Sequence, residues 1–293
     1  MSEIPKMPKV IIDAHTHYSN VQAFYGAADS ARVDYSHEGY VKEQADNNIV
    51  ASVCMGLVET QKWAFPDHAS PTPMYPDLDS DKGLPVGLNI CLGINPHTLN
   101  EESLKKIRQA ISQDRENECR IVGFKIYAGY YHFMIHDPIY SPIYKIAAEH
   151  NLCVAIHTGD TYSEVGLLEY SHPLAADRLA VSFRDTKFLL CHMGDPWIMD
   201  AVEIADKNRN VFLDISGLQA GDAEHIKDAE QREKLMHHYT QGLQYLNKYE
   251  KVLFGTDWPL VPMGAYIEIC KKLVPEYSYS DVFYNNAVNF YGL

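Results

Sequence analysis

The sequence contains no run that approaches 18 uninterrupted apolar residues, and its first ten residues, MSEIPKMPKV, lack the apolar centre of a secretory signal. We therefore expect no transmembrane helix, no signal peptide and a cytoplasmic location. Basic residues are also scarce, with 25 Lys and Arg against 39 Asp and Glu and a formal charge of −14. Such a surface repels phosphate backbones and anionic lipid headgroups, so we predict neither a nucleic-acid partner nor a membrane partner.

Two common motifs are missing as well. No G-x-G-x-x-G turn occurs, which disfavours a nucleotide-dependent redox enzyme. No Cys-x-x-Cys pair occurs, and six scattered cysteines are predicted to be buried free thiols in a reducing compartment: Cys54, Cys91, Cys119, Cys153, Cys191 and Cys270. A chain of 293 residues can bury a core without disulfides or structural metals, so a metal site here would serve chemistry.

Eight short runs of apolar and β-branched residues recur along the chain, at residues 9–17, 49–58, 86–94, 121–127, 153–159, 187–194, 211–217 and 251–258. They are nearly continuous in apolar character, which is typical of strands covered on both faces. Segments with helical periodicity separate most of them. Eight strand–helix repeats over about 250 residues predict an α/β fold, the (β/α)8 TIM barrel. An open doubly wound sheet is the alternative, although it usually has five or six strands.

The sequence predicts one barrel domain over residues 1–293, with two departures from a regular barrel. The link at about 59–85 contains five prolines and little helical period, so we expect an irregular excursion near the barrel mouth. A C-terminal helix with Ser280 as its N-cap is expected outside the barrel. Two further helices are predicted to follow the N-caps Asn100 and Asp195.

Polar side chains stand where several of the apolar runs stop. His15 and His17 close the first run and share one face of a strand, because side chains at i and i+2 point the same way. Later runs end with four further polar residues: Lys125, His157, His192 and Asp257. The carboxyl ends of barrel strands meet at one mouth, where active sites lie. Four imidazoles and a carboxylate gathered there would suit a divalent ion such as Zn²⁺.

Taken alone, each of these residues has an ordinary structural explanation, such as a hydrogen-bonded core histidine. The spacing favours a shared site, since 32 residues separate Lys125 from His157 and 35 separate His157 from His192, about one barrel repeat each. For Asp13 two interpretations stay open. It would either support the imidazoles from behind or satisfy backbone groups at the barrel end.

The motifs DAHTH, GFKIY, IHTGD, CHMGD and FGTDWP, with the tail NNAVNFYGL, together resemble the amidohydrolase superfamily. More narrowly they are similar to its amidohydrolase-related branch, which includes aminocarboxymuconate-semialdehyde decarboxylase and γ-resorcylate decarboxylase. The resemblance implies three histidine metal ligands, Asp257 as ligand and proton shuttle, and His192 as a ligand or the residue that orients water. The three ligands are His15, His17 and His157.

For Lys125 the resemblance leaves two roles open. A carbamylated lysine would bridge two metal ions, whereas a free amine would anchor a substrate carboxylate or oxyanion. One ion, most often zinc in such a site, is the favoured expectation.

The reaction that the resemblance implies is metal-assisted hydrolysis of a C–N or C–O bond in a small, carboxylated amide, lactone or ester. Asp257 would move the proton, and His192 would help to stabilise the oxyanion. Non-oxidative decarboxylation of an aromatic or unsaturated acid by a carboxy-lyase is the alternative. A barrel that has lost its metal and acts only as a binding protein would lack some ligands, and none is missing. We therefore expect a small-molecule substrate as the partner, and the sequence is compatible with a homo-oligomer.

Aromatic residues follow several predicted strand ends and would provide flat walls for a planar substrate: Tyr18, Tyr127, Tyr130, Tyr131, Trp197 and Trp258. Among these, Tyr127 and Trp258 are predicted substrate contacts. Lys125 and His172 complete the predicted substrate site.

Overall fold

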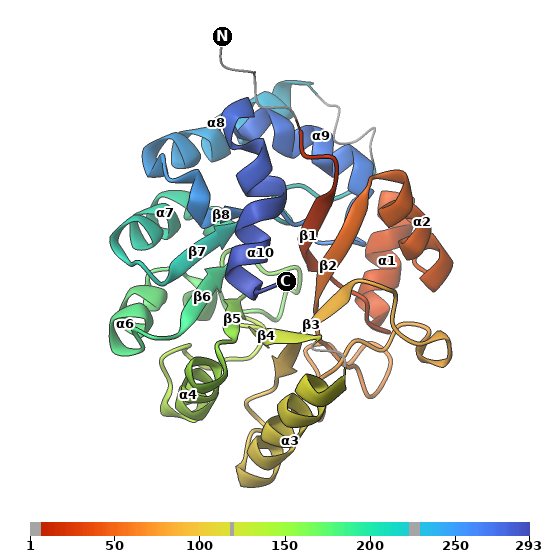
Figure 1. Cartoon of the computed structure of the whole chain (residues 1–293), viewed down its shortest axis with the longest axis vertical. Helices are drawn as coiled ribbons and strands as arrows, with labels where there is room; N and C mark the ends of the chain where they lie inside the picture. The colour runs from red at the N-terminus through yellow and green to blue at the C-terminus, as the bar shows by residue number, and fades with distance from the viewer. Residues whose placement is uncertain (1–6, 118–119, 223–228) are drawn as a thin grey trace.

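The computed structural model describes residues 7–117, 120–222 and 229–293. Eight parallel strands follow one another in chain order around a barrel (Figure 1). They are β1 (Ile11–Thr16), β2 (Ile49–Met55), β3 (Leu88–Ile94), β4 (Ile121–Ile126), β5 (Cys153–Ile156), β6 (Lys187–Leu190), β7 (Val211–Asp214) and β8 (Val252–Leu253). The predicted TIM barrel is confirmed. Each strand is shorter than the run that predicted it, and most of the runs continue into the loops at the barrel mouth.

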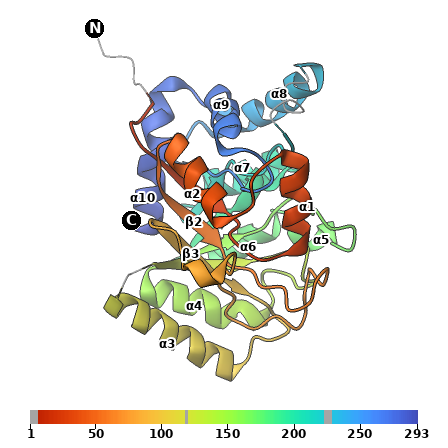
Figure 2. The ribbon, with the colours of Figure 1, turned by 90° about the vertical axis from the view of Figure 1, so that its right-hand side faces the viewer.

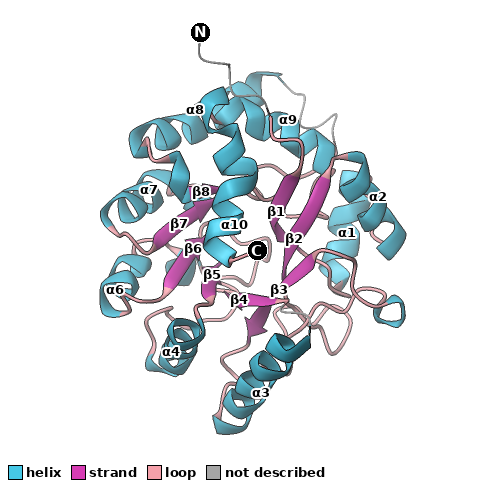
Figure 3. Ribbon diagram, viewed as in Figure 1, coloured by secondary structure: helices cyan, strands magenta, loops and turns pink. Residues whose placement is uncertain are grey.

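Helices surround the strands (Figure 3). The described ranges contain α1 (Gln22–Ala31), α2 (His37–Asp46), α3 (Glu101–Asn117), α4 (Ser141–His150), α5 (Leu168–Ser171), α6 (Ala175–Ser182), α7 (Ile198–Lys207), α8 (Ala229–Leu246), α9 (Met263–Leu273) and α10 (Asn286–Tyr291). Each described helix is too short or too polar to cross a lipid bilayer.

Two of the predicted N-caps can be judged at the start of α3 and α7. Asn100 is confirmed, since its Oδ1 accepts hydrogen bonds from the amides of Glu102 and Ser103 at 3.0 and 3.1 Å. The prediction for Asp195 is wrong, because α7 begins only after Trp197. The Asp195 carboxylate instead accepts a hydrogen bond from the Tyr239 hydroxyl at 3.3 Å.

The inside of the barrel is filled by small and medium apolar side chains from the strands, and α10 covers one end of this inner core. Figures 1 and 2 show α10 lying across the barrel rather than in the outer ring of helices. The Tyr291 hydroxyl donates to the Ala14 carbonyl at 3.1 Å, and the side-chain amide of Asn286 donates to the Val252 carbonyl at 2.8 Å. The C-terminal helix therefore closes the amino end of the strands and leaves the carboxyl end open. Ser280 is not its cap, since this residue is itself helical and makes no capping hydrogen bond.

The barrel closes between β1 and the residues that follow β8. The Asp257 amide donates to the His15 carbonyl at 2.8 Å, and the His17 amide donates to the Trp258 carbonyl at 2.7 Å. Thr256 adds hydrogen bonds from its amide and hydroxyl to the Asp13 carboxylate, at 2.9 and 2.6 Å. The Asp13 carboxylate thus accepts hydrogen bonds from backbone amides and from a hydroxyl. This agrees with the second interpretation, in which Asp13 satisfies backbone groups at the barrel end. This closure brings Asp257 next to His15 and His17.

The link between β2 and β3 is irregular, and its described part contains one short 3-10 helix, Ser80–Lys82, without an α-helix. Met74 and Gly93 exchange two backbone hydrogen bonds of 2.9 Å, which fasten the link to β3. The Tyr131 hydroxyl donates to the Asp67 carbonyl at 3.2 Å and fastens it to the loop after β4. These contacts hold the link beside the barrel mouth.

The five cysteines within the described ranges are free and buried, as predicted. The sixth, Cys119, lies outside the described residues.

Candidate metal centre and active site

Three predicted ligands converge at the mouth of the barrel. Oδ1 of Asp257 lies 3.3 Å from Nε2 of His15 and 3.2 Å from Nε2 of His17. All three residues are buried, and within the described ranges neither Oδ1 of Asp257 nor Nε2 of His15 has a hydrogen-bond partner. Buried polar atoms are normally satisfied, so unpartnered atoms that face one another indicate a ligand. These residues form a group that could hold a metal ion.

Asp214, at the end of β7, fixes the orientation of His15. Its Oδ2 lies 2.9 Å from Nδ1 of His15, and its Oδ1 accepts the amide of His192 at 2.9 Å. A carboxylate can only accept, so Nδ1 of His15 carries the ring proton and Nε2 presents a lone pair towards Asp257. Burial alone would raise the pKa of Asp214, but the neighbouring His15 holds it below its usual value.

His15, His192 and Asp214 form a second group that could hold a metal ion. Two of its ligand atoms, Nδ1 of His15 and Oδ2 of Asp214, already bind each other at 2.9 Å. The Nδ1 atom of His192 lies 3.0 Å from both the carbonyl and the hydroxyl of Ser216. Because these ligand atoms already have hydrogen-bond partners, the group around Asp257 is the better metal site.

His192 and His157 line the mouth beside the three convergent ligands. The ring centre of His192 lies 5.0 Å from that of His15 and 4.9 Å from that of His157. Nδ1 of His192 faces the Ser216 carbonyl and Nε2 of His157 faces the Asp160 carbonyl, at 3.0 and 2.8 Å. A carbonyl accepts only, so these nitrogens carry the protons. Nε2 of His192 and Nδ1 of His157 keep the lone pairs.

The backbone is unusual at two of these residues. His192 has φ of 62° and Asp257 has φ of 63°, in the left-handed region that costs energy for residues other than glycine. Gly217 makes room for both, since a Cβ there would lie 2.7 Å from Oδ2 of Asp257 and from Nδ1 of His192. Strain at these two positions indicates that the fold holds their side chains in place for a function.

The buried imidazoles are neutral at physiological pH. Burial, together with the positive charge of Lys125, lowers the pKa of His15 to about 3. Burial also lowers the pKa of His17 and of His157. For Asp257 burial would raise the pKa, yet the surrounding imidazoles hold it well below its usual value. Neutral imidazole and ionised carboxylate are the forms that bind metals.

Lys125 is buried at the base of the mouth but belongs to neither group of metal-binding residues. Its Nζ lies 3.1 Å from Sγ of Cys191 and 5.5 Å from the centre of the Tyr127 ring. A thiol is a weak partner for an amine, so Lys125 keeps the capacity to bind a substrate group.

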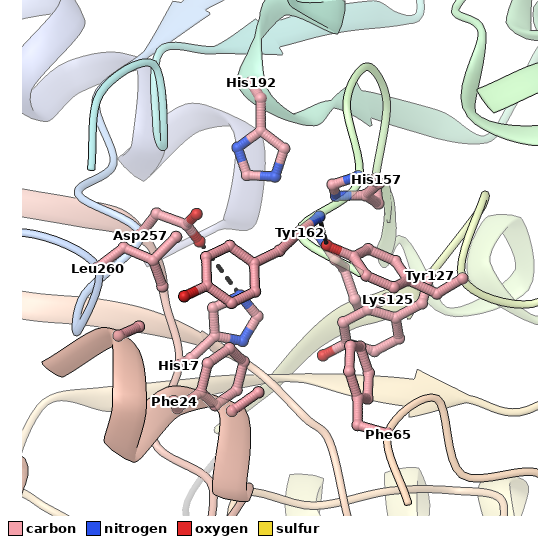
Figure 4. Close-up of a pocket in the computed structure, with 13 residues that line it drawn as sticks. His17, Phe24, Phe65, Lys125, Tyr127, His157, Tyr162, His192, Asp257 and Leu260 are labelled. Atoms are coloured by element: carbon pink, nitrogen blue, oxygen red, sulfur yellow. Dashed lines mark hydrogen bonds and ion pairs between the residues drawn. The ribbon is translucent and has the colours of Figure 1, made fainter. Parts of the chain in front are cut away.

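The mouth contains two adjoining chambers, and Figure 4 shows the side chains around the first of them. Six residues form the wall common to both: Tyr130, His157, Tyr162, His192, Asp257 and Leu260. The inner chamber is also lined by His17, Ala23, Phe24, Ala27, Phe65, Lys125 and Tyr127. The outer chamber is also lined by Asp160, Thr161, Asp195, Gly217 and Ala220.

Of the predicted substrate contacts, Lys125 and Tyr127 line the inner chamber, and two others lie elsewhere. Trp258 is fully buried with its ring 4.9 Å from that of Tyr35, and its Nε1 donates to Glu43 at 3.3 Å. His172 packs against Trp197, with ring centres 4.6 Å apart, and lines neither chamber. Trp258 follows a site residue in sequence, but its side chain packs into the core and not into the mouth.

Several residues of the site escaped the sequence analysis. Phe24 comes from α1, Phe65 from the link between β2 and β3, and Tyr162 from the loop after β5. No periodic pattern marks these positions. Asp214 is different, because it is the one charged side chain within the seventh apolar run and could have been recognised from the sequence on that ground.

Replacing Asp214 by asparagine is expected to weaken divalent-metal binding by about 10- to 100-fold, the usual effect of losing a carboxylate that orients a histidine ligand. Asparagine keeps the shape but allows the His15 ring to turn or change tautomer. Metal affinity would be measured by competition with a chromogenic chelator. Asp200→Asn, which changes a partly exposed carboxylate on α7, is the matched control and should bind as the wild type does. Equal affinities for all three proteins would contradict the role of Asp214.

Comparisons with known proteins are consistent with this geometry. A family profile described as amidohydrolase matches residues 96–293. A TIM-barrel protein from Bordetella bronchiseptica is 16% identical, with a TM-score of 0.66 over 96% of this chain and 97% of its own. No curated protein matches the chain.

Two further solved structures have related shapes. A probable 2-pyrone-4,6-dicarboxylic acid hydrolase from Acinetobacter baumannii, with citric acid bound, is 14% identical over 97% of this chain and 99% of its own, with a TM-score of 0.63. A 5-carboxyvanillate decarboxylase from Novosphingobium aromaticivorans, with manganese bound, is 11% identical over the full length of both chains, with a TM-score of 0.61. At these identities the likeness establishes the fold alone.

Proposed function

The chain belongs to the amidohydrolase family, and on that premise we propose that it is a metal-dependent hydrolase. It would cleave a C–N or C–O bond in a small, carboxylated amide, lactone or ester. The observation that carries the proposal is the convergence of Nε2 of His15, Nε2 of His17 and Oδ1 of Asp257 in a buried site.

His15, His17 and Asp257 would hold one divalent ion, with His157 and His192 beside them. Imidazole and carboxylate together suit Zn²⁺ and also Mn²⁺, which is the ion in the 5-carboxyvanillate decarboxylase structure. A divalent ion bound there supplies Lewis-acid polarisation and lowers the pKa of a water molecule from 15.7 to about 7. Zinc remains the first expectation for this chain.

Asp257 is the proposed catalytic base and acid. Its carboxylate is ionised, because its pKa lies well below the usual value. It can therefore accept a proton from water at one oxygen and return that proton to the leaving group. Its backbone is held between β1 and Leu260, whose amide donates to the Asp257 carbonyl at 3.1 Å, so the carboxylate is fixed in position.

The tautomer of His192 limits its role. With the proton on Nδ1, the second ring nitrogen, Nε2, is the one left to face the mouth. In the neutral form of the ring this nitrogen carries a lone pair, which can bind a cation or accept a proton from water. We therefore assign His192 to binding a cation or orienting water.

Lys125 is the proposed anchor for the substrate carboxylate. An ammonium group buried beside an aromatic ring has lost most of its hydration, so an incoming carboxylate gains a charge-assisted hydrogen bond at little further cost. As a free amine in this role, Lys125 would not be carbamylated and one ion would suffice.

A carboxy-lyase is the second candidate, because an aromatic chamber with a lysine at its base also fits a carboxylated ring. Elemental analysis of the purified protein, followed by parallel assays of lactone, ester, amide and aromatic-carboxylate panels, separates the two. About one equivalent of divalent metal and carboxylate release from a lactone, ester or amide support the hydrolase. Carbon dioxide release from an aromatic acid would replace it with the lyase, and turnover unaffected by loss of the metal would overturn both.

A further inference from the structure

Building on the proposed hydrolase, we infer that the substrate has two chemically different halves, a small anionic acyl half that enters the inner chamber and a cationic amine leaving group that enters the outer chamber. The residues common to the two chambers include Asp257, His192 and His157. Because the catalytic groups stand at the junction, the bond to be cleaved lies there and one half of the substrate extends into each chamber.

The inner chamber selects the acyl half by size and charge. The cavity volume of the inner chamber, counted as the space that the centre of a water molecule can occupy, is about 50 Å³. Its walls include Phe24, Phe65 and Tyr127. Lys125 supplies the one Lys or Arg side chain among the described residues that line either chamber. A short, flat acyl group with a carboxylate at its far end matches both features.

The outer chamber is larger and of opposite charge. Its volume by the same measure is about 220 Å³, and Asp160 and Asp195 line it in addition to Asp257. The Asp160 carboxylate accepts one hydrogen bond from the described residues, from the Thr161 amide at 2.9 Å, which leaves its other oxygen available. Burial raises the pKa of Asp195, the neighbouring His238 and the Tyr239 hydroxyl lower it, and the negative charge of Asp160 raises it again. A cation in this chamber would relieve that repulsion between the two carboxylates.

The size of the outer chamber also bears on the reaction. One product of a carboxy-lyase is carbon dioxide, which needs no second chamber, whereas an amide hydrolase releases an acid and an amine that each need space. In amide hydrolysis the oxygen of water bonds to the carbonyl carbon and the C–N bond breaks. Asp257 transfers one proton of the water to the leaving nitrogen, and the second proton passes from the newly formed carboxylic acid to the released amine. The new carboxylate stays on the Lys125 side, and the ammonium product leaves beside Asp160 and Asp195.

Three N-substituted fumaramates test the inference, because they share one short, flat, anionic acyl half. The substituents are 4-aminobutyl, butyl and 3-carboxypropyl, which are cationic, neutral and anionic at pH 7.5. For the metal-loaded wild type we expect kcat/KM to fall in that order. In Asp160→Asn the preference for the cationic over the neutral amide should drop by about fivefold, the scale of one partly exposed ion pair. The rate for the cationic amide should fall more than the rate for the neutral amide, and Asp46→Asn on α2 should behave as wild type.

Binding of the free leaving groups gives a second measurement that does not need turnover. Calorimetric titration with 1,4-diaminobutane, butylamine and 4-aminobutyrate should show the tightest binding for the diamine, weakened in Asp160→Asn. Equal kcat/KM values for the three amides, or a preference that survives Asp160→Asn, would overturn the inference while leaving the hydrolase intact. If no amide is cleaved, diamine binding that is weakened in Asp160→Asn still supports the inference. If the diamine does not bind, or binds equally well to Asp160→Asn, the inference is overturned. Failure of the hydrolase itself would appear separately, as no carboxylate release from any ester, lactone or amide.

Discussion

Replacement of Asp257 by asparagine is expected to lower kcat by about 10²- to 10⁴-fold, the range for removing a general acid–base group. The carboxylate lies at the junction of the chambers, faces His15 and His17, and can both accept and return a proton. Asparagine has nearly the same shape, but it cannot carry the proton. It also tolerates the left-handed backbone at this position, where φ is 63°, so the fold should persist.

Single-turnover and steady-state kinetics on the metal-loaded variant would measure this loss. Metal content must be determined in parallel, because Asp257 is also a proposed ligand. Asp46→Asn changes an exposed aspartate that pairs with Lys42 on α2, and it serves as the matched control. An Asp257→Asn protein that folds, binds metal and retains kcat within tenfold of wild type would remove Asp257 from the mechanism.

The barrel could be predicted from the sequence because its strands are covered on both faces. Such strands read as continuous apolar runs, and a polar residue at the end of a run stands at the mouth. The pattern therefore predicts that His15, His17 and Asp257 lie at one end of the barrel. Their meeting in three dimensions depends on the closure of β1 onto the residues after β8, which the Asp257–His15 backbone hydrogen bond provides.

The direction of a side chain just beyond a strand could not be predicted in the same way. Alternation of side chains holds only while the chain stays extended. Asp257 leaves the extended conformation, so Trp258 turns into the core against Tyr35 and Tyr40 although it neighbours a site residue. The sequence predicts a substrate contact at Trp258 because this residue directly follows Asp257 in the chain.

The walls of the chambers were the least predictable part of the site. Phe24 and Phe65 reach the inner chamber only because α1 and the β2–β3 link lie over the mouth. Their positions follow from tertiary contacts such as the Met74–Gly93 backbone pair, and no local pattern encodes those contacts. Loops that carry specificity are therefore the parts of a barrel for which the structure adds most.

Removal of the metal is expected to abolish activity and to lower the melting temperature by roughly 5–10 °C. A ligand that binds only the folded state stabilises it by about 4 kcal/mol when present at a thousand times its dissociation constant. For a chain of this size each kcal/mol shifts the midpoint by about 2 °C or slightly more. The wild-type protein would be dialysed against a chelator and then reloaded with zinc or manganese, while activity and thermal unfolding are followed.

The His17→Ala variant separates the effect of the metal from other effects of the chelator. Without His17 the group of His15, His17 and Asp257 loses one of its three ligands, so the variant should bind little metal and its melting temperature should no longer respond to chelator. His172→Ala removes a histidine that lines neither chamber and should keep the wild-type metal content and response. A chelator-induced shift that is as large in His17→Ala as in wild type would mean that the stabilising ion is bound somewhere else, and the proposed centre would have to be abandoned.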